Sequence, residues 1–268
     1  MPLLSIAALL LCTAIIASYA VRVARSGRWK HARLGDSPGT ALCPAWLVES
    51  FYWALAAIGR ALARLGIDPD TLTWLSLAFS LLSLPLIAAG HFPEAALCIG
   101  AGGGLDAIDG LVARVQGRAS PAGALLDAAI DRLSDAAPFV GLALYYRGAA
   151  GTLLVPLAAL VASSLVSYAR ARTDGLGLVL PSGLMRRHER ITYLLLSLLL
   201  GPLVPPLAIA PGIPSPATLI GVAFIAVASA VAATLLVARA RAALTPARST
   251  EAPRRSVLRA FRSLPRQP

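Results

Sequence analysis

The sequence predicts an all-α protein that crosses a membrane several times, and three observations support this fold class. Hydrophobic residues make up 57% of the 268-residue chain, whereas charged residues make up only 14%. The mean hydropathy of +0.73 is too high for a water-soluble domain. The apolar residues are gathered in runs of about 20, the length of helix that crosses a bilayer. We therefore expect a polytopic membrane protein with six core transmembrane helices, one extra N-terminal transmembrane helix and an interfacial amphipathic helix.

The first apolar run covers residues 3–21 and is followed by the basic segment RVARSGRWKHAR. A cleaved signal peptide carries its positive charge before the apolar run, whereas here the charge follows it. We interpret the run as a membrane helix whose N-terminus lies outside. A linker with two glycines and two prolines follows at 35–45, so residues 1–45 form a region of their own.

The next segment, residues 46–66, mixes four aromatic residues with Glu49, Arg60 and Arg64. This mixture predicts an amphipathic helix that lies in the cytoplasmic interface of the membrane. A short core helix is the alternative interpretation.

The remaining apolar runs predict the six core helices. Their expected ranges are 71–89, 93–115, 121–145, 151–172, 191–209 and 217–238. The first one opens with IDPDTLTW, in which Pro69 and the threonines mark a helix start. Residues 46–240 are thus expected to form one domain, followed by a basic cytoplasmic tail at 241–268.

The arginines and lysines indicate how these helices are threaded. Most of them fall in 22–45, 115–120, 170–190, the interfacial helix and the tail. A single threading places all these segments on the cytoplasmic side, as the positive-inside rule requires. The net charge of +11 therefore has a membrane explanation, and no nucleic-acid-binding fold is visible.

The main functional signal is the stretch DAIDGLVARVQGRASPAGALLDAAID, which begins at Asp106 and ends at Asp131. It places four carboxylates, with Asp109 and Asp127 as the inner two, in apolar surroundings. An ionisable group in a membrane helix costs several kcal/mol unless it is compensated, and four groups of one sign need cations. The spacings of three and four residues put each pair on one helix face. The polar link RVQGRASP allows the two faces to oppose, which predicts an oxygen site suited to Mg²⁺ or Mn²⁺ rather than zinc.

Residues beside these carboxylates suit a phosphate-bearing ligand. Gly110 and Ala113 keep one helix thin, so that a ligand can approach the backbone. Arg114 supplies a guanidinium fork that matches phosphate oxygens.

Together these residues fit the pattern D-x-x-D-G-x-x-A-R-x8-G-x3-D-x3-D without a gap. The eight matching positions are Asp106, Asp109, Gly110, Ala113, Arg114, Gly123, Asp127 and Asp131. The pattern resembles the signature of the CDP-alcohol phosphatidyltransferase family, and the resemblance extends over roughly residues 65–210. It implies a divalent-metal-dependent transferase of phospholipid biosynthesis with two Mg²⁺ or Mn²⁺ ions, a CDP-linked lipid donor such as CDP-diacylglycerol, an alcohol acceptor and a homodimer.

The resemblance also implies a role for each matching residue. Metal binding is expected of Asp106, Asp109, Asp127 and Asp131. Asp131 is also expected to act as the general base. Contacts with the CDP part of the donor are expected of Asp109, Gly110, Ala113, Arg114 and Gly123.

The acceptor is indicated by a second similarity. The segments SYARART and GLMRRHER are similar to S-Y-x-x-A-R-A and G-x-x-E-R-x-E-R in the family branch that acts on inositol phosphate or glycerol phosphate. Arg186 stands where this pattern has Glu, and Thr173 follows Arg172. We therefore expect Arg170, Arg187 and Arg190 to bind a phosphorylated acceptor, with positive-inside anchoring as the alternative. Asp135 also resembles this branch, and two roles stay open for it: orienting Arg132 or a water, or packing between helices as a polar residue.

Other classes of protein make different predictions. A transporter or channel could use the acidic cluster as a cation site, but transporters often show internal repeats and broken helices, and the sequence shows neither. A non-catalytic scaffold has no need for the complete eight-residue pattern. We expect an integral protein of a bacterial inner membrane, with the site facing the cytoplasm.

Overall fold

The computed structural model describes residues 2–27, 44–181, 183–204 and 212–245, and these residues form helices joined by short links. The helices are α1 (Pro2–Ser26), α2 (Ala45–Arg64), α3 (Pro69–Ala88), α4 (Phe92–Val115), α5 (Pro121–Tyr145), α6 (Ala150–Gly175), α7 (Arg187–Leu200), the 3-10 turn η1 (Gly201–Leu203) and α8 (Pro216–Leu244). The all-α fold class is confirmed. Most of the predicted linker, part of the predicted 191–209 helix and most of the basic tail lie outside the described residues.

Five of the helices are long and apolar enough to cross a membrane: α1, α3, α4, α6 and α8. The helix α5 has the required length, but it carries Asp127, Asp131, Arg132 and Asp135. The helix α7 has 14 residues, which corresponds to about 21 Å against a hydrocarbon core of about 30 Å. The membrane fold is therefore confirmed, whereas the count of seven crossings stays a prediction.

The predicted bounds of the fifth core helix were wrong. We expected 191–209, but α7 begins at Arg187 and ends at Leu200. Its start is stabilised by Glu189, whose carboxylate accepts a hydrogen bond of 3.1 Å from the backbone N–H of Arg186. At its end, Pro202 lacks the N–H that a further α-helical turn requires, and the chain continues as a 3-10 turn. The earlier start brings Arg187 into the first turn of the helix.

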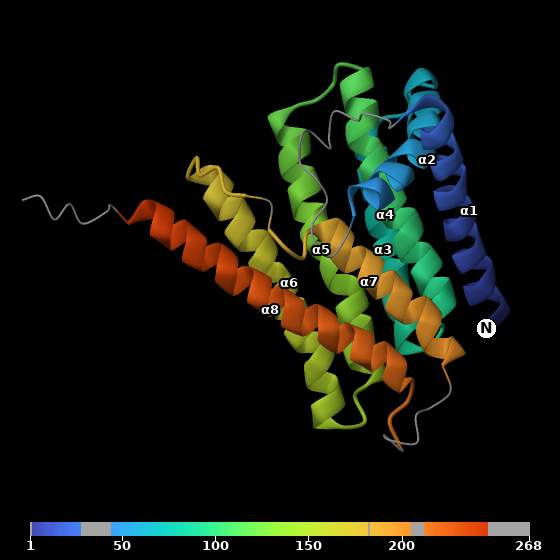
Figure 1. Cartoon of the computed structure of the whole chain (residues 1–268), viewed down its shortest axis with the longest axis vertical. Helices are drawn as coiled ribbons and strands as arrows, with labels where there is room; N and C mark the ends of the chain where they lie inside the picture. The colour runs from blue at the N-terminus through green and yellow to red at the C-terminus, as the bar shows by residue number, and fades with distance from the viewer. Residues whose placement is uncertain (1, 28–43, 182, 205–211, 246–268) are drawn as a thin grey trace, which may run out of the picture.

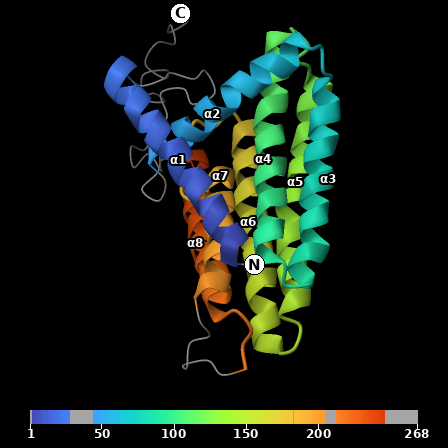
Figure 2. The ribbon, with the colours of Figure 1, turned by 90° about the vertical axis from the view of Figure 1, so that its right-hand side faces the viewer.

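The helices α3, α4 and α5 lie side by side, and α6 packs along α8 (Figure 1). The helix α7 contacts both α4 and α8 and so connects the two groups. The links between α2 and α3 and between α4 and α5 lie at the upper end of the bundle in both ribbon views (Figures 1 and 2). The turn at 115–120 therefore lies next to the end of α2, the helix predicted to lie in the membrane interface. The predicted order of membrane crossings places both on the same side.

Small residues allow α3 to approach its neighbours closely. A Cβ added at Gly102 of α4 would lie 2.9 Å from the carbonyl oxygen of Ser76 on α3. A Cβ added at Gly141 of α5 would lie 2.7 Å from the carbonyl oxygen of Leu84 on α3. Backbone-to-backbone packing of this kind is typical of helices in membranes.

Side-chain contacts fix the upper end of α4. The Gln116 amide nitrogen donates to the carbonyl oxygens of Ala63, at 3.2 Å, and Ile67, at 3.0 Å. Arg118 forms a 2.7 Å ion pair with Asp68. Because Gln116 and Arg118 lie in the link between α4 and α5, these contacts fix the turn that opposes the two acidic helices.

The helix α2 crosses the upper end of the bundle obliquely (Figure 2). Ala56, Gly59 and Ala63 are buried, whereas Trp46 and Phe51 are exposed. This one-sided burial fits an amphipathic helix, and its place in the membrane interface stays a prediction.

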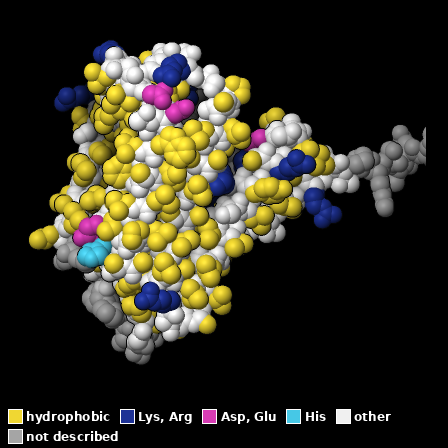
Figure 3. Space-filling model, turned by 180° about the vertical axis from the view of Figure 1, so that it is seen from behind, with side chains coloured by type: hydrophobic (Ala, Val, Ile, Leu, Met, Phe, Trp, Pro, Cys, Tyr) yellow, Lys and Arg dark blue, Asp and Glu magenta, His cyan; other side chains and the backbone are white. Residues whose placement is uncertain are grey.

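The helix α1 is attached to α2 by a buried tyrosine. The Tyr19 side chain is 2% exposed, and its hydroxyl donates to Glu49 at 2.8 Å. Its ring also lies against that of Trp53. The surface seen from behind is largely hydrophobic, with scattered charged side chains (Figure 3). A hydrophobic surface of this kind suits a protein that is integral to a membrane.

Candidate metal and transfer site

Three of the four predicted carboxylates meet between α4 and α5. One oxygen atom from each of Asp106, Asp109 and Asp127 lies within 4.8 Å of the other two. The helix α5 starts at the right place because the Ser120 hydroxyl accepts a hydrogen bond of 3.1 Å from the backbone N–H of Gly123. The two acidic faces therefore oppose each other, as the spacing predicted.

Asp109 is the most buried member of this group, with 4% of its surface exposed. One carboxylate oxygen accepts a hydrogen bond of 2.6 Å from the Thr73 hydroxyl of α3. The other accepts a hydrogen bond from the backbone N–H of Gly110. Thr73 belongs to the helix opening singled out in the sequence, but its contact with Asp109 was not predicted.

The fourth carboxylate, Asp131, is not part of the group of three. Its Oδ1 lies 2.7 Å from Nη1 of Arg187. The same Nη1 donates to Oδ2 of Asp106 at 2.6 Å. An arginine predicted to bind the acceptor therefore bridges two carboxylates predicted to bind metal.

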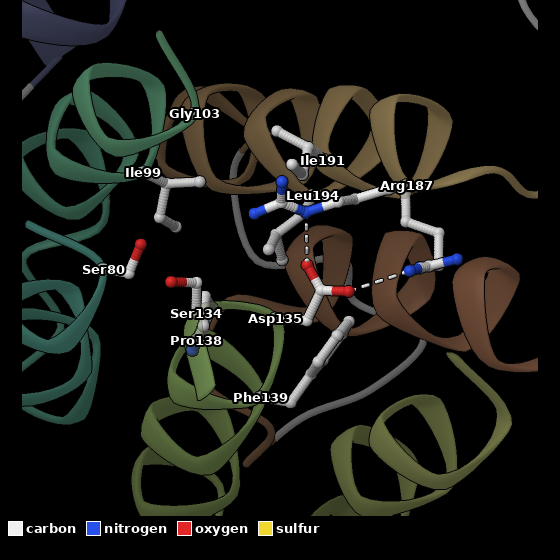
Figure 4. Close-up of a pocket in the computed structure, with 11 residues that line it drawn as sticks. Ser80, Ile99, Gly103, Ser134, Asp135, Pro138, Phe139, Arg187, Ile191 and Leu194 are labelled. Carbon is white, nitrogen blue, oxygen red and sulfur yellow. Dashed lines mark hydrogen bonds and ion pairs between the residues drawn. The ribbon is translucent and has the colours of Figure 1, made fainter. Parts of the chain in front are cut away.

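Asp135 lies one helical turn beyond Asp131 and binds two arginines. Its Oδ1 accepts a hydrogen bond of 3.1 Å from Nε of Arg187, and its Oδ2 accepts one of 2.9 Å from Nη2 of Arg190 (Figure 4). We expected Asp135 to orient Arg132 or a water. Its described partners are instead Arg187 and Arg190, and Arg132 is exposed.

Arg190 is held on several sides. Besides Asp135, it donates to the carbonyl oxygen of Met185 at 2.8 Å and to the Ser167 hydroxyl at 2.9 Å. The side chain is 4% exposed. Met185 has a φ of 54°, which is unfavourable for a residue with a side chain, and the hydrogen bond from Arg190 helps to hold this turn.

The other predicted residues lie at the ends of the same helices. Gly110, Ala113 and Arg114 belong to the last turns of α4, and Arg114 is exposed. A Cβ at Gly123 would lie 3.4 Å from the Ser120 hydroxyl, an ordinary contact, so the packing of the chain itself tolerates a side chain there. Arg170 is half-buried at the end of α6, where its guanidinium lies against the backbone of Gly183.

These residues fit divalent metal ions. Five aspartates against two guanidinium groups leave the set Asp106, Asp109, Asp127, Asp131, Asp135, Arg187 and Arg190 with a formal charge of −3. Buried charge of one sign is costly and favours cation binding. Among the described residues, no side chain or backbone group donates a hydrogen bond to the buried Oδ1 of Asp106. The all-oxygen ligand set suits Mg²⁺ or Mn²⁺.

A small cavity with both polar and apolar lining residues lies beside the Asp135 network. It measures about 30 Å³, which is room for about two waters. Its polar lining includes the hydroxyls of Ser80 and Ser134, which point towards each other in Figure 4. The cavity is too small for a substrate, and it belongs to the packing between α3, α4, α5 and α7.

Comparisons with known proteins agree with this geometry. The model of the CDP-alcohol phosphatidyltransferase family matches residues 67–247. A phosphatidylinositol phosphate synthase of Mycobacteroides abscessus is 33% identical over 151 residues, which cover 55% of this chain and 69% of the relative. An archaetidylinositol phosphate synthase of Pyrococcus horikoshii is 37% identical over 144 residues, which cover 53% of this chain and 75% of the relative.

Solved structures are also similar. A crystal structure of Mycobacterium tuberculosis phosphatidylinositol phosphate synthase with CDP-DAG bound gives a TM-score of 0.60 at 30% identity, over 69% of this chain and 92% of the other. The same enzyme in complex with manganese and citrate gives a TM-score of 0.60, also at 30% identity, over 70% and 88% of the two chains.

Proposed function

Because the chain belongs to the CDP-alcohol phosphatidyltransferase family, we propose that it transfers the phosphatidyl group of CDP-diacylglycerol to inositol phosphate and releases CMP. The donor is supported by the related structure that contains CDP-DAG. The acceptor is supported by the synthases to which the chain is similar. Glycerol phosphate is the alternative acceptor, since the same arginines suit any phosphorylated alcohol.

The observation that carries this proposal is the group of three carboxylates on α4 and α5. We assign one divalent ion to Asp106, Asp109 and Asp127, and a second to a site that includes Asp131. Manganese in the related structure supports a divalent ion. Such ions neutralise the diphosphate of the donor and make CMP a better leaving group.

Among the protein residues, Asp131 is assigned the proton transfer. Asp131 accepts the proton from the acceptor hydroxyl, whose oxygen then attacks the phosphorus that carries diacylglycerol. The bond from this phosphorus to the bridging oxygen breaks, and the oxygen leaves with CMP. The product is a lipid phosphodiester.

The CDP part of the donor is assigned to Asp109, Gly110, Ala113, Arg114 and Gly123. Gly123 supports this assignment, because the fold itself does not require a glycine there. A ligand that approaches the backbone closely would require one.

The acceptor phosphate is assigned to Arg170 and Arg187. Both side chains are partly accessible, and Arg187 already contacts the carboxylates at which the acceptor must react. Arg190 is committed to Asp135, Met185 and Ser167, so we assign it a positioning role that acts through Asp135.

We infer the position of the site in the cell from the distribution of charge. The basic turn at 115–120 lies at the end of the bundle at which the acidic helices meet. We place this end on the cytoplasmic side of a bacterial plasma membrane. Residues 46–240 are proposed as the catalytic domain, and a homodimer as the assembly.

The test is a reaction of the purified full chain with CDP-diacylglycerol and Mg²⁺ or Mn²⁺. Inositol phosphate, glycerol phosphate, inositol and serine are supplied separately, and the products are identified by mass. We expect CMP and phosphatidylinositol phosphate, and no product after chelation of the metal. Metal uptake into vesicles without CMP release would instead support the transporter alternative.

A further inference from the structure

Arg187 makes two kinds of contact at opposite edges of its guanidinium group. The Nε edge donates to Asp135 at 3.1 Å. The Nη1 end lies 2.6 Å from Asp106 and 2.7 Å from Asp131. The side chain is 24% exposed, so part of it is accessible.

The two edges are not held equally well. Asp135 is fixed by Arg190, which is itself fixed by Met185 and Ser167. The contact between Nη1 and Asp131 is close, but the Asp131 oxygen does not accept a hydrogen bond of normal geometry in the described part of the chain. The Nε edge is therefore an anchor, whereas the contact with Asp131 is an ion pair without a well-directed hydrogen bond.

A metal ion and Nη1 compete for the Asp131 oxygen. A carboxylate oxygen binds Mg²⁺ at about 2.0–2.1 Å, and at this distance the ion would repel a guanidinium group on the same oxygen. Asp106 already belongs to the group of three, and its second oxygen, which is buried without a hydrogen-bond donor among the described residues, can bind the ion of that group. The competition therefore concerns the ion at Asp131.

We infer that Arg187 couples the second metal ion to the phosphorylated acceptor, an inference that rests on the proposed function. Binding of the ion at Asp131 frees the N–H of Nη1 that faces Asp131, while Asp106 and Asp135 keep the guanidinium in place. The freed N–H then binds the phosphate of the acceptor. By linkage, the acceptor phosphate tightens the second ion by the same factor by which the ion tightens the acceptor.

The test measures binding and not turnover. Free Mn²⁺ is followed by its EPR signal during titration of the purified full chain without CDP-lipid. Arg187→Lys keeps the positive charge but loses the fork that spans three carboxylates. We expect the weaker Mn²⁺ site of this variant to bind about tenfold tighter, within the range typical of coupling between sites. The matched control is Arg132→Lys, at an exposed arginine of the same helix as Asp131, and its Mn²⁺ affinities should stay unchanged.

A second arm tests the coupling to phosphate. Inositol phosphate should tighten the weaker site of the wild-type chain about tenfold, and free inositol should not. In Arg187→Gln the weaker site should bind Mn²⁺ tightly even without inositol phosphate, and addition of inositol phosphate should not increase its Mn²⁺ affinity further. The tighter site, held by Asp106, Asp109 and Asp127, reports that each variant is folded.

The outcomes separate the inference from the proposed function. Equal or weaker Mn²⁺ binding in both Arg187 variants, or equal effects of inositol and inositol phosphate, would overturn the coupling while leaving the transfer reaction in place. A wild-type chain that binds no Mn²⁺ would overturn both.

Discussion

The Thr73 hydroxyl on α3 donates a 2.6 Å hydrogen bond to the buried carboxylate of Asp109 on α4. Thr73 therefore fixes the direction in which Asp109 presents its other lone pairs. Partners of this kind around metal ligands are worth about 10–100-fold in metal affinity or activity.

Thr73→Val should raise the Mg²⁺ concentration needed for half-maximal activity about tenfold, because Asp109 loses its orienting partner. Valine keeps the shape of the side chain, so the helix packing should be retained. The measurement is CMP release against Mg²⁺ concentration. Thr71→Val, at an exposed position two residues earlier, is the matched control. An unchanged Mg²⁺ requirement would show that the hydrogen bond has no role in metal binding.

Arg170→Gln should raise the KM for the phosphorylated acceptor about 10-fold or more, because a charge-assisted hydrogen bond contributes about 1.5–3 kcal/mol. The KM for CDP-diacylglycerol should not change. Arg172→Gln, at an exposed arginine near the end of the same helix, serves as the control. Equal effects of the two substitutions would indicate that both arginines act only through general positive charge.

Gly141→Ala should lower the stability of the protein, because its Cβ would lie 2.7 Å from the Leu84 carbonyl oxygen and 3.0 Å from Cβ of Ile87. Overpacking of this kind costs about 1–3 kcal/mol. The thermal unfolding midpoint in detergent measures the effect. Gly100→Ala is the control, since its Cβ would meet nothing within 4 Å. A midpoint for Gly141→Ala as high as that of Gly100→Ala would contradict the close packing of α3 and α5.

The sequence predicted the acidic helices because their signal is local. Asp106 and Asp109 share a face through helical spacing, as do Asp127 and Asp131, and Pro121 and Gly117 mark the turn between the two helices. Apolar runs bounded by prolines, glycines or charges predict where six helices lie in the sequence: α1, α3, α4, α5, α6 and α8. The predicted bounds of the fifth core helix were wrong, because the charged residues at 187–190 were assigned to the preceding loop and because the apolar sequence continues beyond Pro202, where the helix has already ended.

The ion network could not be predicted in the same way. Arg187 lies 81 positions after Asp106, and Thr73 lies 36 positions before Asp109. Their contacts depend on how α3 and α7 pack against α4, and no local spacing encodes this packing. Asp135 was assigned to Arg132 because the two are close in sequence, whereas the fold brings Arg187 and Arg190 to it.

The central claim is that the carboxylates between α4 and α5 bind the metal ions needed for phosphatidyl transfer. CMP release from CDP-diacylglycerol in the presence of inositol phosphate and Mg²⁺ or Mn²⁺ tests it most directly when wild-type protein is compared with Asp127→Asn. The substitution keeps the size of the side chain but removes its charge. We expect the variant to insert into the membrane and to purify like the wild type, with no measurable CMP release. CMP release by Asp127→Asn at the wild-type rate would contradict the claim.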